Sequence, residues 1–234
     1  MNRTISTEPH VDPTAFLPRK PVQEFPRKHT IYGPGEACDH IYAVRSGRVV
    51  LTSAFDSAAP SVTRIVGPKG IFGEAMLVGT CDPSESAVTL DRTSVMSWSR
   101  AEIEQQMMRD ARLANALLGY FVIRCAELAE RVEALAFYRT PERVMLGLLQ
   151  LAENLGTPAS GAMRLAPLTH RIIAEYVGTS RELVTFHMCE FRRAGLLQYS
   201  RSFIDANVGL MRKTLENGGF VHSATETPMV QSAV

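Results

Sequence analysis

The chain has 234 residues, of which 45% are hydrophobic, so it can bury substantial cores, and we expect two domains of modest size. A formal net charge of +1 excludes a polycation, so any affinity for nucleic acid must come from a local patch. The four cysteines form no C-x-x-C pair, which argues against a disulfide framework and a zinc ribbon. The chain has neither a signal-peptide pattern nor a run of about 18 apolar residues, so we expect a cytoplasmic protein with no membrane partner.

The N-terminal half shows two kinds of pattern. Residues 1–15 are rich in Thr, Ser, Pro, Glu and Asp with little apolar periodicity, so a mobile tail is expected there. From 25 to 99, short apolar runs alternate with glycine and proline. Many short strands with frequent turns are typical of a β-barrel or a β-sandwich.

A long helix is predicted from about residue 110 to 136. Its apolar side chains recur at helical spacing, at Leu113, Leu117, Phe121, Leu128, Val132 and Leu135. A helix of about 26 residues spans about 39 Å, which is long for the core of one domain. We therefore expect it to pack both on its own barrel and on a second copy of the chain. The alternative is a helix that is buried within one subunit only.

The domain boundary is predicted just after this helix. Thr140 can cap a new helix with Pro141 at its first position, and this helix should run to about Asn154. We expect 156–161 to be a loop and 163–165 to be a short strand. Beyond residue 220 the chain has turn formers and no sustained period, so 221–234 is predicted to be a disordered tail.

Residues 168–201 predict two short helices joined by a tight turn. Thr169 can cap the first helix, Gly178 suits the turn, and Ser180 can cap the second helix. The second helix buries one face, which carries Val184, Met188 and Phe191. Its other face carries polar and mixed side chains, namely Arg181, Glu182, Thr185, Phe186 and Cys189. This face suits base edges and phosphates in a major groove better than a protein core, although an ordinary pair of core helices is the alternative. The following 198–204 stretch, which contains Arg201, is typical of a β-wing.

These residues resemble a known family. The run VGTSRELVTF resembles the reading helix of the bacterial catabolite-activator and fumarate-nitrate regulators, the Crp/Fnr transcription factors. The pieces YGPGE, DHIYAVRSGRVVL, GPKGIFGE and SAVTL resemble, in order, the jelly-roll sensor barrel of the same family. The resemblance extends from about residue 16 to 220.

The resemblance implies an α+β architecture with three functional parts. It implies an N-terminal jelly-roll barrel, like a cyclic-nucleotide-binding domain, over 16–109. A dimerisation helix and hinge would cover 110–138, and a winged helix-turn-helix would cover 139–220. It further implies a homodimer that binds double-stranded DNA at inverted repeats and acts with RNA polymerase.

The resemblance also assigns roles on the reading helix. Arg181 and Glu182 match the family's arginine and glutamate that contact a guanine and a cytosine. Phe186 stands where the family has an arginine that reads a further guanine, so we expect preference for that guanine to be lost.

The sensor barrel keeps only part of the family's cyclic AMP site. Gly73 and Glu74 match a Gly-Glu pair that holds the ligand, although such a turn can also simply start a helix. The phosphate-binding Arg-Ser pair is replaced by Glu85 and Ser86, and a carboxylate repels a phosphate. On the long helix, Leu128 and Ala129 replace hydroxyl side chains that reach the base. Cyclic AMP is therefore not expected to bind.

Two other cofactors of the family are also disfavoured. No cysteine precedes Cys38, which argues against an N-terminal iron–sulfur cluster. Haem would need a ligand near the long helix, and Cys81 is only loosely placed for that role. The sequence leaves the effector unidentified.

The rival functional classes are a cupin-like enzyme and a cyclic-nucleotide-binding protein that does not bind DNA. A cupin needs two or three histidines and a glutamate inside the barrel, but here Gly35 and His40 are followed by Tyr42. We therefore expect no metal site and no enzymatic activity. Glu85 and the predicted reading helix disfavour the second class.

Overall fold

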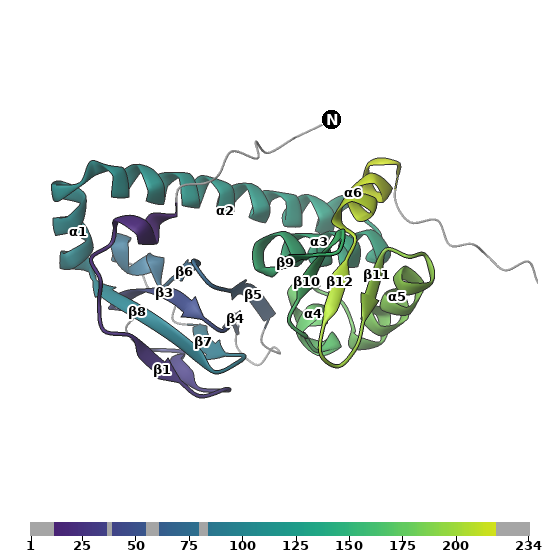
Figure 1. Ribbon diagram of the computed structural model, residues 1–234, viewed down its shortest axis with the longest axis horizontal. Helices are drawn as coiled ribbons and strands as arrows, with labels where there is room; N and C mark the ends of the chain where they lie inside the picture. The colour runs from purple at the N-terminus through teal and green to yellow at the C-terminus, as the bar shows by residue number, and fades with distance from the viewer. Residues whose placement is uncertain (1–11, 37–38, 55–60, 80–83, 219–234) are drawn as a thin grey trace, which may run out of the picture.

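The computed structural model describes residues 12–36, 39–54, 61–79 and 84–218. A β-rich domain and a smaller α/β domain lie side by side, and one long helix runs along both (Figure 1). The expected order of barrel, long helix and C-terminal helix-turn-helix is confirmed. No helix in the described part of the chain is long and apolar enough to cross a membrane.

The N-terminal domain is built from two antiparallel four-stranded sheets, in the orders β1-β8-β3-β6 and β2-β7-β4-β5. Its strands are β1 (Gln23–Phe25), β2 (Thr30–Tyr32), β3 (His40–Ser46), β4 (Val49–Ser53), β5 (Ser61–Val66), β6 (Ile71–Phe72), β7 (Glu85–Thr89) and β8 (Thr93–Ser99). Two 3₁₀ turns accompany them, η1 (Pro13–Phe16) and η2 (Glu74–Val78). Inward-facing side chains such as Phe72 and Val95 are fully buried between the sheets, where they pack with Val49 and Ala87 of the opposite sheet. This is the expected jelly-roll arrangement.

The predicted N-terminal tail is partly wrong. Residues 13–15 belong to η1, because Asp12 caps this turn and Pro13 is buried. Leu17 then packs in the core beneath α1 and α2. Residues 1–11 and the predicted C-terminal tail over 221–234 lie outside the described residues.

Two helices leave the barrel. Helix α1 (Arg100–Arg109) begins with a capping box between Ser99 and Glu102. Helix α2 (Ala111–Phe137) follows, and its N-cap is Asp110, whose carboxylate accepts a hydrogen bond from the Arg112 amide. The first turns of α2 cover the barrel, whereas its last turns reach the C-terminal domain. The same helix therefore connects the two domains.

The C-terminal domain has four helices and a four-stranded sheet in the order β11-β12-β10-β9. Its elements are α3 (Thr140–Leu155), β9 (Thr157–Ala159), β10 (Ala162–Leu165), α4 (His170–Val177), α5 (Arg181–Arg193), β11 (Leu197–Tyr199), β12 (Ile204–Ala206) and α6 (Val208–Glu216). The winged helix-turn-helix is thus confirmed, with two corrections. Strand β9 occupies part of the expected 156–161 loop, where it pairs with β10. Arg139 is the N-cap of α3, so Thr140 is its first helical residue rather than its cap.

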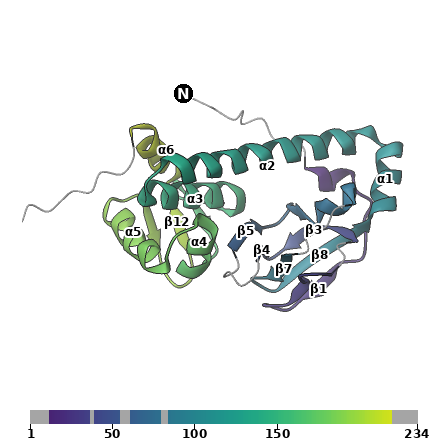
Figure 2. The same ribbon diagram turned by 180° about the vertical axis from the view of Figure 1, so that it is seen from behind.

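The two domains share one hydrophobic core. Barrel residues Val50, Val62 and Ile65 belong to the same buried cluster as Leu148 in α3 and Ile173 in α4. In both views α4 lies between the barrel and α5, so α5 is held at the end of the molecule away from the barrel (Figure 2). The outer face of α5 is therefore open.

Candidate nucleic-acid interface

The helix-turn-helix is formed by short-range hydrogen bonds. The Thr169 hydroxyl accepts a hydrogen bond from the Ile172 amide at the start of α4, and the Ser180 hydroxyl accepts one from the Leu183 amide at the start of α5. Gly178 has φ of +75°, a left-handed conformation that glycine adopts without strain. Both predicted caps and the predicted turn are confirmed.

One face of α5 anchors the helix in the domain. The predicted core side chains Val184, Met188 and Phe191 are all fully buried. His187 is also buried, and its ring stacks on Phe191 with centroids 6.1 Å apart. The opposite face of α5 is therefore the one presented to solvent.

That outer face forms an open groove. The groove is lined by Arg181, Glu182, Thr185, Phe186, Cys189, Glu190 and Arg193. It brings together the predicted DNA-contacting residues of α5, with Phe186 half exposed. An α-helix presented in this way fits the width of a DNA major groove.

A hydrogen-bonded chain fixes the first turns of α5. The Thr185 hydroxyl donates to the Arg181 carbonyl at 2.9 Å, so its oxygen is left to accept from His170 Nδ1 at 2.8 Å. Burial and the nearby Arg181 guanidinium lower the pKa of His170. His170 thus supports Thr185, one of the predicted DNA-contacting residues of α5.

The wing completes this surface. The Tyr199 ring, from β11, meets the edge of the His170 ring at a centroid distance of 5.8 Å, and its hydroxyl lies 3.5 Å from Cys189 Sγ. The Arg192 guanidinium lies over the same tyrosine ring at 5.2 Å. Arg201 is exposed in the turn between β11 and β12. His170, Tyr199 and Arg192 were not among the predicted site residues, because their contacts depend on how the wing folds back on α5.

Two arginines of the helix-turn-helix are partly neutralised. Arg171 pairs with Glu175 at 2.7 Å, and Arg193 pairs with Glu190 at 3.2 Å. Each pair lies within a single helix and has an exposed guanidinium, so both ion pairs are weak. Both arginines can therefore exchange their carboxylate partners for DNA phosphates. The surface is therefore only mildly basic.

Helix α2 presents an apolar stripe to solvent. The stripe consists of Leu118, Val122, Cys125, Ala129, Val132 and Ala136, at alternating spacings of four and three residues. Leu128 and Leu135 flank it and are also exposed. This spacing is the a/d pattern of a two-helix seam.

The predicted dimer contacts need correction at three positions. Leu113 and Leu117 are buried in their own barrel core, and Phe121 packs against the same cluster. Leu113 and Leu117 therefore cannot face a second subunit while the barrel is folded, and Phe121 is partly buried against its own barrel. The remaining predicted residues, Leu128, Val132 and Leu135, lie on or beside the exposed stripe.

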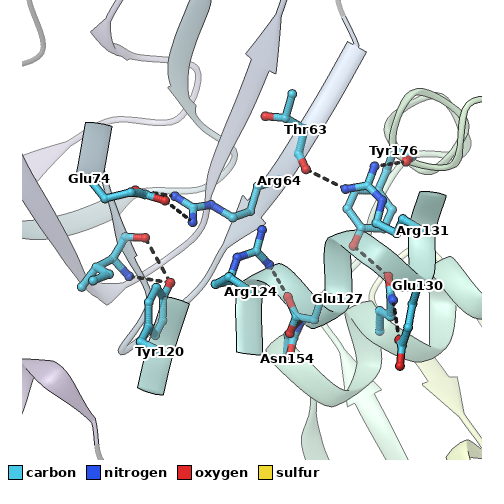
Figure 3. Close-up of polar contacts among 12 residues, drawn as sticks. Thr63, Arg64, Glu74, Tyr120, Arg124, Glu127, Glu130, Arg131, Asn154 and Tyr176 are labelled. Carbon is cyan, nitrogen blue, oxygen red and sulfur yellow. Dashed lines mark hydrogen bonds and ion pairs between the residues drawn. The ribbon is translucent and has the colours of Figure 1, made fainter. Parts of the chain in front are cut away.

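The sensor barrel holds an internal ion pair at the predicted ligand position. Both carboxylate oxygens of Glu74 accept hydrogen bonds from Arg64, at 2.7 and 2.9 Å (Figure 3). The Arg64 side chain is 10% exposed and that of Glu74 is 30% exposed, so the arginine is buried while the carboxylate is still partly in contact with solvent. Gly73 is the left-handed N-cap of η2, so the Gly-Glu turn does start a short helix. Beside it, the Tyr120 hydroxyl bonds both the amide and the carbonyl of Ile71.

The other predicted pocket residues are engaged as well. Glu85 accepts a hydrogen bond from the Tyr32 hydroxyl at 2.7 Å, and the Ser86 and Thr52 hydroxyls lie 2.7 Å apart. Leu128 is 46% exposed on α2, which places it on the solvent side rather than in its own barrel.

Known proteins match both domains. Residues 22–110 match the cyclic nucleotide-binding domain family, and residues 142–207 match the Crp-like helix-turn-helix domain. A CRP-like cAMP-activated global transcriptional regulator of Mycobacterium tuberculosis is 30% identical over 176 residues, which cover 75% of this chain and 79% of the relative. The chain belongs to the Crp/Fnr family of transcriptional regulators.

Further similarities agree with this assignment. The global nitrogen regulator of Synechocystis is 25% identical and is covered over 83% of its length, with 78% of this chain aligned. The structure of FixK2 from Bradyrhizobium japonicum has the same fold, with a TM-score of 0.71, 22% identity, and 82% of this chain and 96% of that chain covered. This Crp/Fnr protein is thus a DNA-binding transcriptional regulator, and its curated relatives are regulators rather than enzymes.

In the sensor of this Crp/Fnr protein, both candidate ligand carboxylates have partners within the barrel. Glu74 accepts hydrogen bonds from Arg64, and Glu85 accepts one from Tyr32. No group of three or more His, Cys, Asp or Glu residues that could hold a metal occurs in 12–36, 39–54, 61–79 or 84–218. Cys38 and Cys81, named for the iron–sulfur and haem alternatives, lie outside the described residues.

Proposed function

We propose that this regulator binds DNA as a homodimer, with the two copies of α5 in successive major grooves of an inverted repeat. The proposal rests on two surfaces that are exposed to solvent in the single subunit. The outer face of α5 is open, and the stripe on α2 exposes Leu118, Val122 and Val132 with seam spacing. Since each subunit can gather few phosphates, two are needed for tight binding.

The roles of the DNA-contacting residues follow from their chemistry. Arg181 reads a guanine through two donors, and Glu182 accepts from a cytosine amino group. Phe186 has no donor, so it contacts only apolar surface such as a thymine methyl. Thr169, Ser180, Thr185 and Cys189 lie at the helix starts or on the outer face, where they meet the backbone. Arg201 at the wing tip contacts phosphate.

The proposal includes control by something other than cyclic AMP. Arg64 already occupies the Glu74 carboxylate, and Glu85 would repel a cyclic phosphate, so the effector is of another class or regulation is by abundance. The protein acts in the cytoplasm, has no catalytic activity, and works through RNA polymerase, as its relatives' designation as transcriptional regulators suggests.

Selection of bound duplexes from a random pool tests this function. The purified full-length protein, without added nucleotide, should enrich an inverted repeat whose half-site centres lie about one helical turn, roughly 10 bp, apart. Enrichment of an asymmetric single site, or no enrichment at all, would overturn the proposal. Transcription with purified RNA polymerase from the enriched site then tests whether the two proteins act together.

A further inference from the structure

Helix α4 is held at its C-terminal end by Arg131 of α2. Nη2 of Arg131 donates to the Tyr176 carbonyl at 2.7 Å, and Nη1 donates to the Thr63 carbonyl at 2.7 Å (Figure 3). The guanidinium also lies over the Tyr176 ring, 4.2 Å from its centroid. One side chain therefore joins the barrel, the long helix and the helix-turn-helix.

Neither acceptor carbonyl is used in the regular hydrogen bonding of its own helix or sheet. Tyr176 is the penultimate residue of α4, and the last carbonyls of a helix have no partner within it. Thr63 lies where the pairing of β4 with β5 shifts register, since Leu51 pairs with Arg64 while Thr52 pairs with Val62. Such a bulge leaves the extra residue unpaired. A cation at a helix C-terminus is also favoured by the helix dipole.

The segment before α4 is held by a second arginine, Arg48 of the barrel. Its guanidinium binds Asp91 through two hydrogen bonds, of 2.6 and 3.1 Å. It also donates to the Ala166 and Pro167 carbonyls, each at 3.0 Å. Arg48 is buried, and Asp91 offsets its charge. The first helix of the helix-turn-helix is thus tethered at both ends.

We propose that Arg131 and Arg48 are positioning residues that set the distance between the two half-sites read by a dimer. This inference rests on the proposed function. Because α2 carries the exposed seam stripe, the orientation of α4 against α2 determines where α5 lies relative to the dimer axis. The two tethers hold that orientation. Loss of a tether would leave each reading helix intact but would let the two helices adopt several separations.

The geometry also specifies why arginine is needed. The Thr63 and Tyr176 carbonyls are approached by different nitrogens of one planar group that stacks on a ring at the same time. A lysine ammonium is a point charge that cannot reproduce this fork and stacking together. Arg131→Lys should therefore resemble Arg131→Ala more than the wild type.

The test measures affinity as a function of half-site spacing. Full-length wild type, Arg131→Ala, Arg131→Lys and Arg48→Ala are titrated, by fluorescence anisotropy, against the selected inverted repeat and against versions lengthened or shortened by one and two base pairs. Each added base pair rotates one half-site about the DNA axis, so wild type should lose about tenfold or more in affinity at two base pairs. Across the same series, the affinity of the tether variants should change by about threefold or less. Their profile is flatter mainly because they bind the preferred spacing more weakly than the wild type does.

Controls separate positioning from folding. Arg100→Ala removes an exposed ion pair with Glu104 on α1 and should keep the wild-type spacing profile. Affinity for a single half-site and the circular dichroism spectrum should be unchanged in the tether variants. If Arg131→Ala fails to fold, Arg131→Lys and Arg48→Ala carry the same comparison.

The outcomes are distinguishable. A wild type without spacing preference would overturn the proposed dimeric reading, and the inference with it. A wild type with a sharp preference, together with folded tether variants that keep the same profile, would overturn the inference alone. Flattened profiles with unchanged half-site affinity would support it.

Discussion

We expect individual side chains on α5 and the wing to have separable roles in DNA binding. Arg181 lies in the outer groove of α5, whereas Arg201 is exposed in the wing turn. Arg181→Ala should cost about 1–3 kcal/mol on the operator and relax preference at one base pair. Arg201→Ala should weaken all sequences alike and lower the salt slope by about 1. Binding to a panel of single-base operator variants at several salt concentrations measures both, and identical sequence profiles would refute this division.

His170 should make stability depend on pH. Burial and the Arg181 guanidinium lower the pKa of His170 below the usual value of 6.5. Protonation of His170 is therefore less favourable in the folded protein than in the unfolded chain. The unfolded state then binds more protons between the two pKa values, and the free energy of unfolding should fall as the pH drops below about 6.5. Urea unfolding from pH 7.5 to 5 should show a smaller fall in His170→Gln. An unchanged pH dependence would remove His170 as its source.

At this scale, the sequence predicted the groups whose partners are near in the chain. The Thr169 and Ser180 caps and the buried Val184 follow from spacing within one or two turns. The Tyr199 contact with His170 and the Arg64–Glu74 pair could not be predicted, because they depend on how separate strands and helices pack. Glu74 was therefore recognised only as part of a motif, without its partner.

Among the elements, α3 and α4 pack closely enough to require a glycine. A Cβ on Gly147 would lie 2.6 Å from Val177 Cγ2 in α4. Gly→Ala in a helix usually stabilises by about 1 kcal/mol, but overpacking costs about 1–3 kcal/mol. We expect Gly147→Ala to lower the melting temperature. Gly119→Ala in α2 is the matched control, since its Cβ would meet nothing within 4 Å, and it should raise the melting temperature. Equal effects of the two variants would contradict this packing argument.

Helix α2 should respond differently to changes on its two faces. Val122 is 60% exposed on the stripe, and Leu113 is fully buried in the barrel core. Val122→Glu should convert a dimer to a folded monomer, because it puts like charges together on an apolar seam. Leu113→Ala should cost about 2–5 kcal/mol of stability and leave a dimer. Light scattering after size-exclusion chromatography measures the oligomeric state of each variant, and thermal unfolding measures its stability. A dimeric Val122→Glu protein would exclude this seam.

The error over Leu113, Leu117 and Phe121 has a physical origin. Helix α2 is apolar on two faces, and both faces satisfy a helical period, so spacing alone cannot say which one meets the barrel. The burial of Leu113 and the exposure of Leu118 make this distinction. Strand β9 was missed for a related reason, because Pro158 and the neighbouring turn residues favour a loop until β10 provides a pairing partner.

For the whole molecule, the order of domains was predictable and their relative orientation was not. Alternating apolar runs predict the barrel, and helical spacing predicts α2 and the helix-turn-helix. The shared core around Val50 and Ile173, and the tethers of Arg48 and Arg131, arise only after both domains have folded. These long-range contacts fix the relative orientation of the two domains.

The sensor should not take up cyclic AMP. The Arg64–Glu74 pair holds the carboxylate that the family uses for the ligand, and Glu85 would repel the phosphate. Calorimetry with cyclic AMP should give no heat of binding at micromolar concentrations. A micromolar dissociation constant would contradict the assignment of Glu85 to the phosphate position. Glu85→Arg is a useful comparison, because it restores the family's charge there.

The most direct measurement is a titration of the purified protein, without nucleotide, against the selected inverted repeat and against the same duplex with one half-site scrambled. A dimeric reader should bind the full repeat at about 10⁻⁸ M or tighter, which is the usual range of specific complexes at physiological salt. It should bind the scrambled duplex at least about 100-fold more weakly, because one subunit then loses its base contacts. Cyclic AMP should change neither value. Equal affinity for the two duplexes, or tight binding only when cyclic AMP is added, would contradict the account.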